Sequence, residues 1–319
     1  MTRLAHSFAF DIRPFPPYSF KLTMQKPAGW SLFTQFEIFK NDALWTALHV
    51  DGDLIGLKLS SKGTIERPHI LAKVFLKEKP TEEELQTLKE ALKGRLGADQ
   101  DLKEFYSLAK RDNILKHVVD DLYGMHDTDS GDIFAGALLA ILLQMAPMER
   151  SEHMMESIIK RYGDLAEFDG KRILTWPTSK RISGVTAKEL AKECKVGYRA
   201  KRIVPLARFL ESGKFPSIEE LKNMSAEEAK EKLLELPGIG DYSADMINPH
   251  GGFPIDVWSV EIFGKLFYGK EPKNNRNAIE KVKKEGIKRW GEWSWMAFFY
   301  VVQDLKTLSE RLGIELRLE

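Results

Sequence analysis

The sequence has 319 residues, enough for one large domain or two of medium size, and 43% of them are apolar. No apolar run reaches the about 18 residues of a membrane span, and the N-terminal segment lacks the apolar core of a signal peptide. A single cysteine, Cys194, excludes a disulfide framework and an all-cysteine metal or iron–sulfur site. We therefore expect a protein that is not secreted, in the cytoplasm or nucleoid, or in the nucleus of a eukaryote.

The charges are segregated although the net charge is only +1. Residues 171–210 contain eleven Lys or Arg against two Glu, and residues 265–289 contain nine against three. Such segregation can give a nearly neutral protein one basic face for a polyanion. The alternative is a set of ordinary solvated helix faces.

Residues 1–75 have the pattern of a strand-rich region. Short segments rich in aromatic or β-branched residues alternate with Pro, Gly, Asn or Asp: SFAFDI, YSFKLTM, FTQFEIF, ALWTALHV, LIGLKLS and HILAKVFL. Asp51-Gly52 predicts a tight turn between the fourth and fifth of them. We expect these segments to form an antiparallel sheet.

Helical patterns follow from Thr81, which forms a capping box with Glu84, to the end of the chain. We predict helices near 81–94, 99–111, 113–121, 132–146, 151–163, 187–194, 199–212, 217–223, 226–235, 241–247, 256–268, 275–290 and 293–312. The predicted class is α+β: an antiparallel sheet domain with helices over 1–112, then an α-helical domain over 113–319.

The segment LPGIGDY, residues 236–242, joins two of the predicted helices through a proline and two glycines. The first helix begins with a Ser225–Glu228 capping box, and the carboxylate of Asp241 can cap the second. So tight a hairpin leaves backbone amides facing outward, where a phosphate can approach closely. The alternative is an ordinary tight turn with glycine for steric reasons.

LPGIGDYSAD, followed by NPHGGFP and IDVWSVEIFGKLF, resembles the helix-hairpin-helix and Gly/Pro-Asp motif of the DNA glycosylase superfamily. ILLQMAPMERSEHMMESIIKRYGD and FPSIEEL are similar to further segments of that family. PAGWSLFTQFEI resembles the opening of the TBP-like strand domain found in the 8-oxoguanine and 3-methyladenine II branches. The resemblance covers most of the chain and implies a helix-hairpin-helix DNA glycosylase domain.

The resemblance implies that Asp256 is catalytic. Cleavage of an N-glycosidic bond builds positive charge on the sugar, and a carboxylate beside C1′ stabilises it and orients water. The alternative for Asp256 is a helix N-cap, a role that can coexist with catalysis.

Bifunctional members of the family carry a nucleophilic lysine two residues after the last hairpin glycine. Tyr242 occupies that position here. The resemblance therefore implies a monofunctional enzyme that hydrolyses the bond and has no lyase lysine. The single cysteine also rules out the four-cysteine cluster of the endonuclease III branch.

The same match implies the residues that handle a flipped base. A wedge, Gln144 and Met145, would fill the gap left in the duplex, and aromatic walls would stack on the base: Tyr242, Trp293 and Trp258. Core packing is the alternative for Met145 and both tryptophans. An electron-rich pocket would favour cationic alkylated purines.

Phosphate contacts are predicted at the hairpin and on a basic segment: Gly238, Ile239, Gly240, Lys195, Arg199, Lys201 and Arg202. The family's hairpins also bind a monovalent cation through main-chain carbonyls, which here would belong to Leu234, Leu236 and Ile239. We expect no required cofactor; a structural Na⁺ or K⁺ at the hairpin is what the resemblance implies.

The prediction as a whole is a monomeric, monofunctional glycosylase that removes damaged purines from duplex DNA in base excision repair. Alkylated bases such as 3-methyladenine are the first choice, with deaminated purines as an extension. The alternatives are an 8-oxoguanine glycosylase and a catalytically silent helix-hairpin-helix module that only binds DNA.

Overall fold

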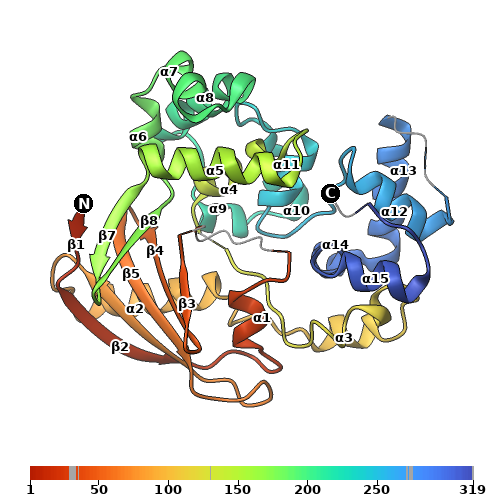
Figure 1. The fold of residues 1–319 in the computed structure, drawn as a ribbon, viewed down its shortest axis with the longest axis horizontal. Helices are drawn as coiled ribbons and strands as arrows, with labels where there is room; N and C mark the ends of the chain where they lie inside the picture. Colours follow the sequence, from red (N-terminus) through yellow and green to blue (C-terminus); the bar gives the residue numbers. More distant parts are fainter. Residues whose placement is uncertain (29–33, 35, 130, 271, 273–275, 318–319) are drawn as a thin grey trace.

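The structure, a computed structural model, describes residues 1–28, 34, 36–129, 131–270, 272 and 276–317. Figure 1 shows the strands gathered at one end of the molecule, with the helices in two groups beside them. Within the described ranges, no helix has the length and apolar character that crossing a bilayer requires.

The main sheet has five antiparallel strands in the order β2 (His6–Ile12), β6 (Ile70–Leu76), β5 (Asp53–Ser61), β4 (Ala43–Val50) and β3 (Ile38–Lys40). Asp51 and Gly52 both have positive φ, 50° and 88°, in the turn between β4 and β5. This confirms the predicted Asp-Gly turn, because the favoured two-residue hairpin turn needs positive φ at both positions.

Strand β4 is buried on both faces of the sheet. Leu44 and Leu48 point to the side where α2 (Glu82–Arg95) packs, and Trp45 and Ala47 point to the other side. Helix α2 begins at the predicted capping box, with Thr81 Oγ1 accepting the amide of Glu84 at 3.2 Å.

A second sheet covers the other face, and the sequence prediction missed it. Strands β7 (Asp164–Phe168) and β8 (Lys171–Thr175) form a hairpin between helices, and β1 (Thr2–Arg3) pairs in parallel with β7. The ring of Phe168 fills the space above Gly56, where a Cβ would lie 2.6 Å from it. The predicted helical region therefore contains two strands that support the first sheet.

The prediction of a strand at YSFKLTM is wrong. The segment forms α1 (Phe20–Met24), and Ser19 caps it by accepting the amide of Leu22 at 3.3 Å. Phe20, Thr23 and Met24 are buried at helical spacing. Part of FTQFEIF lies outside the described residues, and β3 begins only at Ile38.

The remaining helices are α3 (Lys103–Ala109), α4 (Ile133–Leu143), α5 (Met148–Tyr162), α6 (Ser179–Ser183), α7 (Ala187–Cys194), α8 (Ala200–Glu211), α9 (Ile218–Lys222), α10 (Ala226–Leu234), α11 (Asp241–Ile247), α12 (Ser259–Tyr268), α13 (Arg276–Trp290), α14 (Ser294–Gln303) and α15 (Leu305–Leu312). The helix predicted over 293–312 is two helices that meet at Asp304, and the one predicted over 113–121 is a short 3₁₀ turn, Leu115–His117. Helix α6 was not predicted.

Two apolar cores hold the helices. The first core is built around α4, which buries nine residues, and includes α5, α7, α8, α10 and α11. The second core joins α3 to α12, α13, α14 and α15. Residues 102–125 pack in this second core, and the domain boundary near 112 stays a prediction.

Candidate active site

The predicted hairpin is present and is anchored in the first core. Helix α10 starts at the Ser225–Glu228 capping box, and Leu233, Leu236 and Ile239 are buried beneath the turn. Gly238 has φ +82°, and a Cβ there would lie 2.6 Å from Cβ of Arg202. Only glycine satisfies both the backbone angle and the packing at this position.

Gly240 differs from Gly238. Its φ is −114°, which any residue adopts, and a Cβ would meet nothing within 4 Å. Nothing among the described residues therefore requires a glycine here, and the space in front of the turn is open. The predicted cap by Asp241 is wrong: Gly240 is the N-cap of α11, and the Asp241 carboxylate contacts lysines instead.

The turn after α4 faces the hairpin. Gln144 Nε2 donates to Ser243 Oγ at 2.8 Å and to the carbonyl of Gly238 at 3.4 Å, and Gln144 Oε1 accepts from Arg202. Met145 follows with φ +52°, and 70% of its surface is exposed. Of the two predicted wedge residues, Gln144 braces the hairpin and Met145 projects from the turn.

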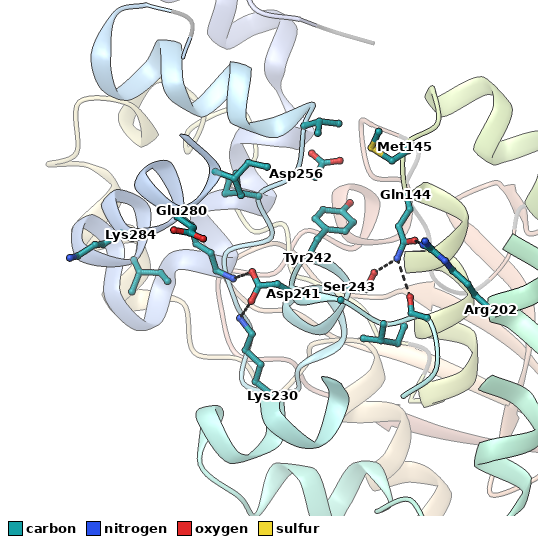
Figure 2. Close-up of a pocket in the computed structure, with 18 residues that line it drawn as sticks. Gln144, Met145, Arg202, Lys230, Asp241, Tyr242, Ser243, Asp256, Glu280 and Lys284 are labelled. Atoms are coloured by element: carbon teal, nitrogen blue, oxygen red, sulfur yellow. Dashed lines mark hydrogen bonds and ion pairs between the residues drawn. The ribbon is translucent and has the colours of Figure 1, made fainter. Parts of the chain in front are cut away.

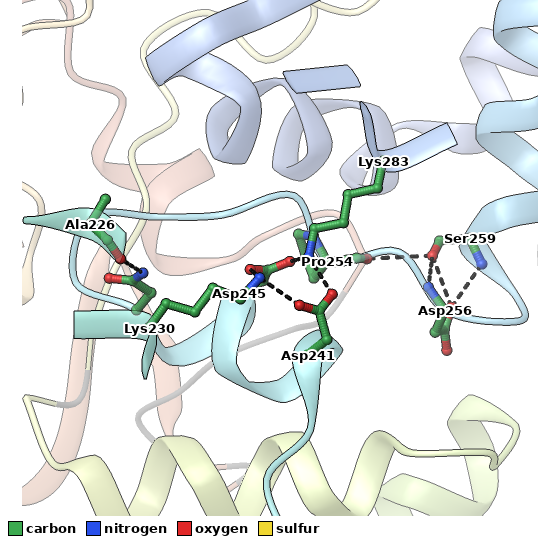
Figure 3. Close-up of polar contacts among 9 residues, drawn as sticks. Ala226, Lys230, Asp241, Asp245, Pro254, Asp256, Ser259 and Lys283 are labelled. Carbon is green, nitrogen blue, oxygen red and sulfur yellow. Dashed lines mark hydrogen bonds and ion pairs between the residues drawn. The ribbon is translucent and has the colours of Figure 1, made fainter. Parts of the chain in front are cut away.

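Asp256 lies at the end of a loop that enters the second core through Phe253 and Ile255. Its Oδ1 accepts the amide of Trp258 at 3.1 Å. The same oxygen accepts the amide of Ser259 at 2.9 Å and lies 2.8 Å from Ser259 Oγ (Figure 3). Asp256 therefore holds the turn that precedes α12, a role close to the alternative interpretation, although Trp258 is the N-cap residue of that helix. Its Oδ2 makes no hydrogen bond within the described residues, so one oxygen is anchored and the other is available.

A cavity of about 1040 Å³ brings these parts together. The hairpin and Met145 line it from one side, and Asp256 and α13 from the other (Figure 2). Tyr242 is half-buried in the cavity, and burial, with a further contribution from the charge of Asp256, raises the pKa of its hydroxyl. The phenol is therefore neutral at physiological pH.

No family model matches this chain. Two curated proteins are similar in sequence. A DNA-3-methyladenine glycosylase of Bacillus subtilis is 26% identical over 208 residues, 64% of this chain and 67% of its own length. A probable N-glycosylase/DNA lyase of Methanothermobacter thermautotrophicus is 26% identical over 223 residues, 63% of this chain and 70% of its own length.

Solved structures show the same fold. The 3-methyladenine DNA-glycosylase of Archaeoglobus fulgidus superposes with a TM-score of 0.72 at 22% identity, over 96% of this chain and 100% of that one. An apo 8-oxoguanine glycosylase/lyase of Clostridium acetobutylicum superposes with a TM-score of 0.68 at 20% identity, over 92% and 95%. The chain is therefore similar in sequence to DNA glycosylases and has the fold of solved helix-hairpin-helix members, which supports DNA glycosylase activity in DNA repair.

Two predicted pocket walls lie elsewhere in this glycosylase. Trp293 and Trp258 pack against the second core, and Trp293 lies 5.8 Å from the ring of Phe105. Neither lines the cavity, so among the predicted aromatic walls only Tyr242 does. The physical reason is that most aromatic side chains in such a segment pack in the core, and the sequence alone does not show which ring faces a cavity.

Arg199 also corrects the prediction. Only 2% of its surface is exposed, and its guanidinium donates to the carbonyls of Ile141, at 3.2 Å, and Gln144. It satisfies the C-terminal carbonyls of α4 and is not on a surface open to DNA. Lys195 and Lys201 are exposed, and Arg202 lines the cavity.

The predicted cation ligands lie at the end of α10 and in the turn. Within the described residues, the carbonyl of Leu234 accepts no hydrogen bond from the turn, and that of Leu236 accepts one, from Ile239 at 3.1 Å. Carbonyls with free lone pairs suit Na⁺ or K⁺, so the residues fit the ion and the site stays a prediction. No group of three His, Cys, Asp or Glu side chains in the described ranges could hold a metal.

Four charged side chains beside the hairpin were missed by the sequence analysis: Lys230, Asp241, Asp245 and Lys283. The basic run over 265–289 contains Lys283, but its partners lie about 40 residues earlier. The sequence feature that could have indicated this cluster is the pair of aspartates at 241 and 245, which are one helical turn apart and therefore on the same face of the helix.

Proposed function

We propose that this glycosylase is monofunctional: it flips a damaged purine out of duplex DNA and hydrolyses the N-glycosidic bond. The observation that carries the proposal is Asp256, which lines the cavity opposite the hairpin and whose Oδ1 is held by the turn before α12. It acts where genomic DNA is, and it acts as a monomer.

The chemistry follows from the anchored carboxylate. As the base leaves with the electrons of the broken bond, positive charge develops on the deoxyribose, and the carboxylate stabilises that charge. A water then attacks C1′ and passes its proton to Asp256. Because Oδ1 is fixed by two amides, the group does not reorganise during the reaction.

The lysines of the cavity support hydrolysis over lyase chemistry. A Schiff base needs a neutral amine, and Lys230 and Lys283 are both paired with carboxylates. Although burial lowers the pKa of Lys230, its hydrogen bonds to Asp241 and Asp245 outweigh burial and raise it overall. Lys284, exposed at the cavity edge, is the lysine on which the lyase alternative depends.

The turn after α4 supports base flipping. Met145 combines an exposed apolar side chain with a left-handed backbone, a conformation that non-glycine residues rarely adopt. Its neighbour Gln144 ties the turn to the hairpin. A flexible thioether that projects from a braced turn can fill the gap that an extruded nucleotide leaves.

Alkylated purines are the proposed substrates. The Tyr242 ring in the cavity attracts a cationic base, a contact worth about 0.5–2 kcal/mol. The name of the B. subtilis relative agrees with this choice, whereas the C. acetobutylicum neighbour acts on 8-oxoguanine and is also a lyase. Deaminated purines are an extension of the same proposal.

A panel of lesion duplexes, each with and without alkali after the reaction, tests the proposal. We expect release of 3-methyladenine-type bases, strand breaks only after alkali, and no covalent adduct with borohydride. Nicking without alkali, an adduct that Lys284→Gln removes, or activity confined to 8-oxoguanine would contradict it. Salt-dependent duplex binding with no base released would identify a silent DNA-binding module instead.

A further inference from the structure

Lys230, Asp241, Asp245 and Lys283 form a closed arrangement that we call the ion ring. Lys230 Nζ lies 2.6 Å from Asp241 Oδ1 and 2.7 Å from Asp245 Oδ1. Lys283 Nζ contacts the second oxygen of each carboxylate (Figure 3). Each lysine therefore bridges both aspartates, and the charges of the ring sum to zero.

The ion ring connects the two walls of the cavity. Lys230 is on α10, and Asp241 and Asp245 are on α11, so three members belong to the hairpin and the first core. Lys283 is on α13, next to Val282 of the second core. Asp256 is held by the second core as well, through its neighbour Ile255.

The loop that leads to Asp256 also rests on the ring. At its start, Asn248 Nδ2 donates to the carbonyl of Ala226 at 3.0 Å. At Gly252 the loop passes so close to Asp245 that a Cβ would lie 2.6 Å from Cβ of that aspartate. The loop then ends at Asp256, so one aspartate of the ring packs directly against the loop that carries Asp256.

Two of the four residues in the ion ring are largely buried. The side chain of Asp245 is 4% exposed and that of Lys283 is 14% exposed. Burial raises the pKa of Asp245, and the two lysines oppose that shift. Removing the partners of such a buried carboxylate destabilises the folded protein, because the remaining charge is left uncompensated. The folded state therefore favours the positions in which the lysines contact Asp245.

We propose that the ion ring is a positioning device for base excision, with Lys283 as the residue that holds Asp256 at its working distance from the hairpin. This rests on the proposed function. A direct phosphate contact by Lys283 is the competing role, and its burial between two carboxylates argues against it. Misplacement of a catalytic group by about 1 Å costs up to about 100-fold in rate.

The ring has a second consequence at the hairpin. Asp241 is 57% exposed and is the first residue of α11, next to the turn predicted to bind phosphate. Its charge would repel DNA unless the lysines compensate for it. Loss of Lys283 should therefore have two effects: Asp256 shifts relative to the hairpin, and the uncompensated charge of Asp241 repels DNA. The experiment below separates them.

The test compares single-turnover base release at saturating enzyme with duplex affinity. We expect Lys283→Gln to lower the saturated rate about 10- to 100-fold. The double variant Asp241→Asn/Lys283→Gln restores a ring charge of zero, and we expect it to recover affinity but not rate. Lys283→Arg can still bridge two carboxylates and should retain most of the rate.

Lys288→Gln is the matched control, with the same change in charge on α13 at an exposed position outside both the ring and the cavity lining. It should leave the saturated rate unchanged. Lys283→Gln should also speed hydrogen exchange at the amides of Trp258 and Ser259, which donate to Asp256. This measurement reports the position of Asp256 without an activity assay. An unchanged saturated rate and exchange, or full recovery in the double variant, would overturn the positioning role.

If Lys283→Gln does not fold, Asp241→Asn opens the ring at its exposed corner and should slow the saturated rate about threefold, the equivalent of about 0.7 kcal/mol. An unchanged rate in that variant would count against the proposal in the same way. Wild-type enzyme in the same assay separates the proposed function from the positioning role of the ring. No base release from any lesion would contradict the proposed function. Normal release by the wild type together with unaffected ring variants would contradict only the positioning role.

Discussion

The two walls of the cavity are built in different ways. The hairpin wall presents a backbone turn with two glycines, flanked by Tyr242, Arg202 and the paired Lys230 and Asp241, and Met145 projects from the turn opposite. The opposite wall, formed by the loop before α12 and by α13, presents Asp256 and two lysines of α13. This difference suggests a division of labour, in which the first wall binds and distorts DNA and the second performs the chemistry.

Asp256→Asn should break the chemistry of the second wall and leave the first intact. Asparagine keeps an oxygen for the amides of Trp258 and Ser259, so the fold should be unchanged. Loss of the charge and of the proton acceptor should lower single-turnover base release by about 10² to 10⁴-fold. Duplex affinity is the internal control, and a variant that releases base at the wild-type rate would exclude Asp256 from catalysis.

Met145→Ala should break the distorting part of the first wall. Without the thioether, the gap in the duplex is unfilled, and we expect base release to fall about tenfold, the equivalent of about 1.4 kcal/mol. Met145→Leu keeps the volume and should retain most of the rate. Fluorescence of 2-aminopurine placed beside the lesion reports flipping directly. Equal flipping by the Ala and Leu variants would show that the exposed methionine has no such role.

The two hairpin glycines should respond differently to replacement by alanine. Gly238→Ala has to adopt φ +82° and displace Arg202, so denaturant unfolding should show a loss of about 1–2 kcal/mol or more. Gly240→Ala meets no neighbour and should unfold like the wild type. Similar losses in both variants would mean that the two glycines serve the same structural purpose.

Lys201→Gln should give the smallest effect, a reduction of about 0.9 in the slope of log affinity against log salt. Arg199→Gln should instead lower thermal stability, because Arg199 satisfies carbonyls at the end of α4. A salt slope that changes with Arg199 and not with Lys201 would reverse the assignment of these two residues.

The parts of the fold that could be predicted from sequence are those with local signals. The Thr81 and Ser225 capping boxes, the Asp51-Gly52 turn and the hairpin glycines each specify their own conformation. The hairpin of β7 and β8 had such a signal too. Asp169-Gly170 has φ of 46° and 68°, a second turn of the same kind, but it lies in a long helical context that obscured it.

The site was predictable only as far as its motif. Asp256, Met145 and Tyr242 line one cavity, as the motif implied, because the hairpin and the loop after it are local in sequence. The ion ring depends on Lys283 of α13 reaching the carboxylates of α11, and no local pattern in the sequence indicates that contact. Which of several clustered aromatic rings faces a cavity is likewise decided by packing, as Trp293 shows.

The most direct test of the division of labour measures two quantities, duplex affinity and the saturated single-turnover rate, for Asp256→Asn and Gly240→Leu on one lesion duplex. Asp256→Asn should lower the saturated rate and keep the duplex affinity. Gly240→Leu should block the open space before α11, lose affinity by about tenfold or more, and keep the saturated rate. If both quantities fall together in either variant, binding and chemistry are not divided between the two walls.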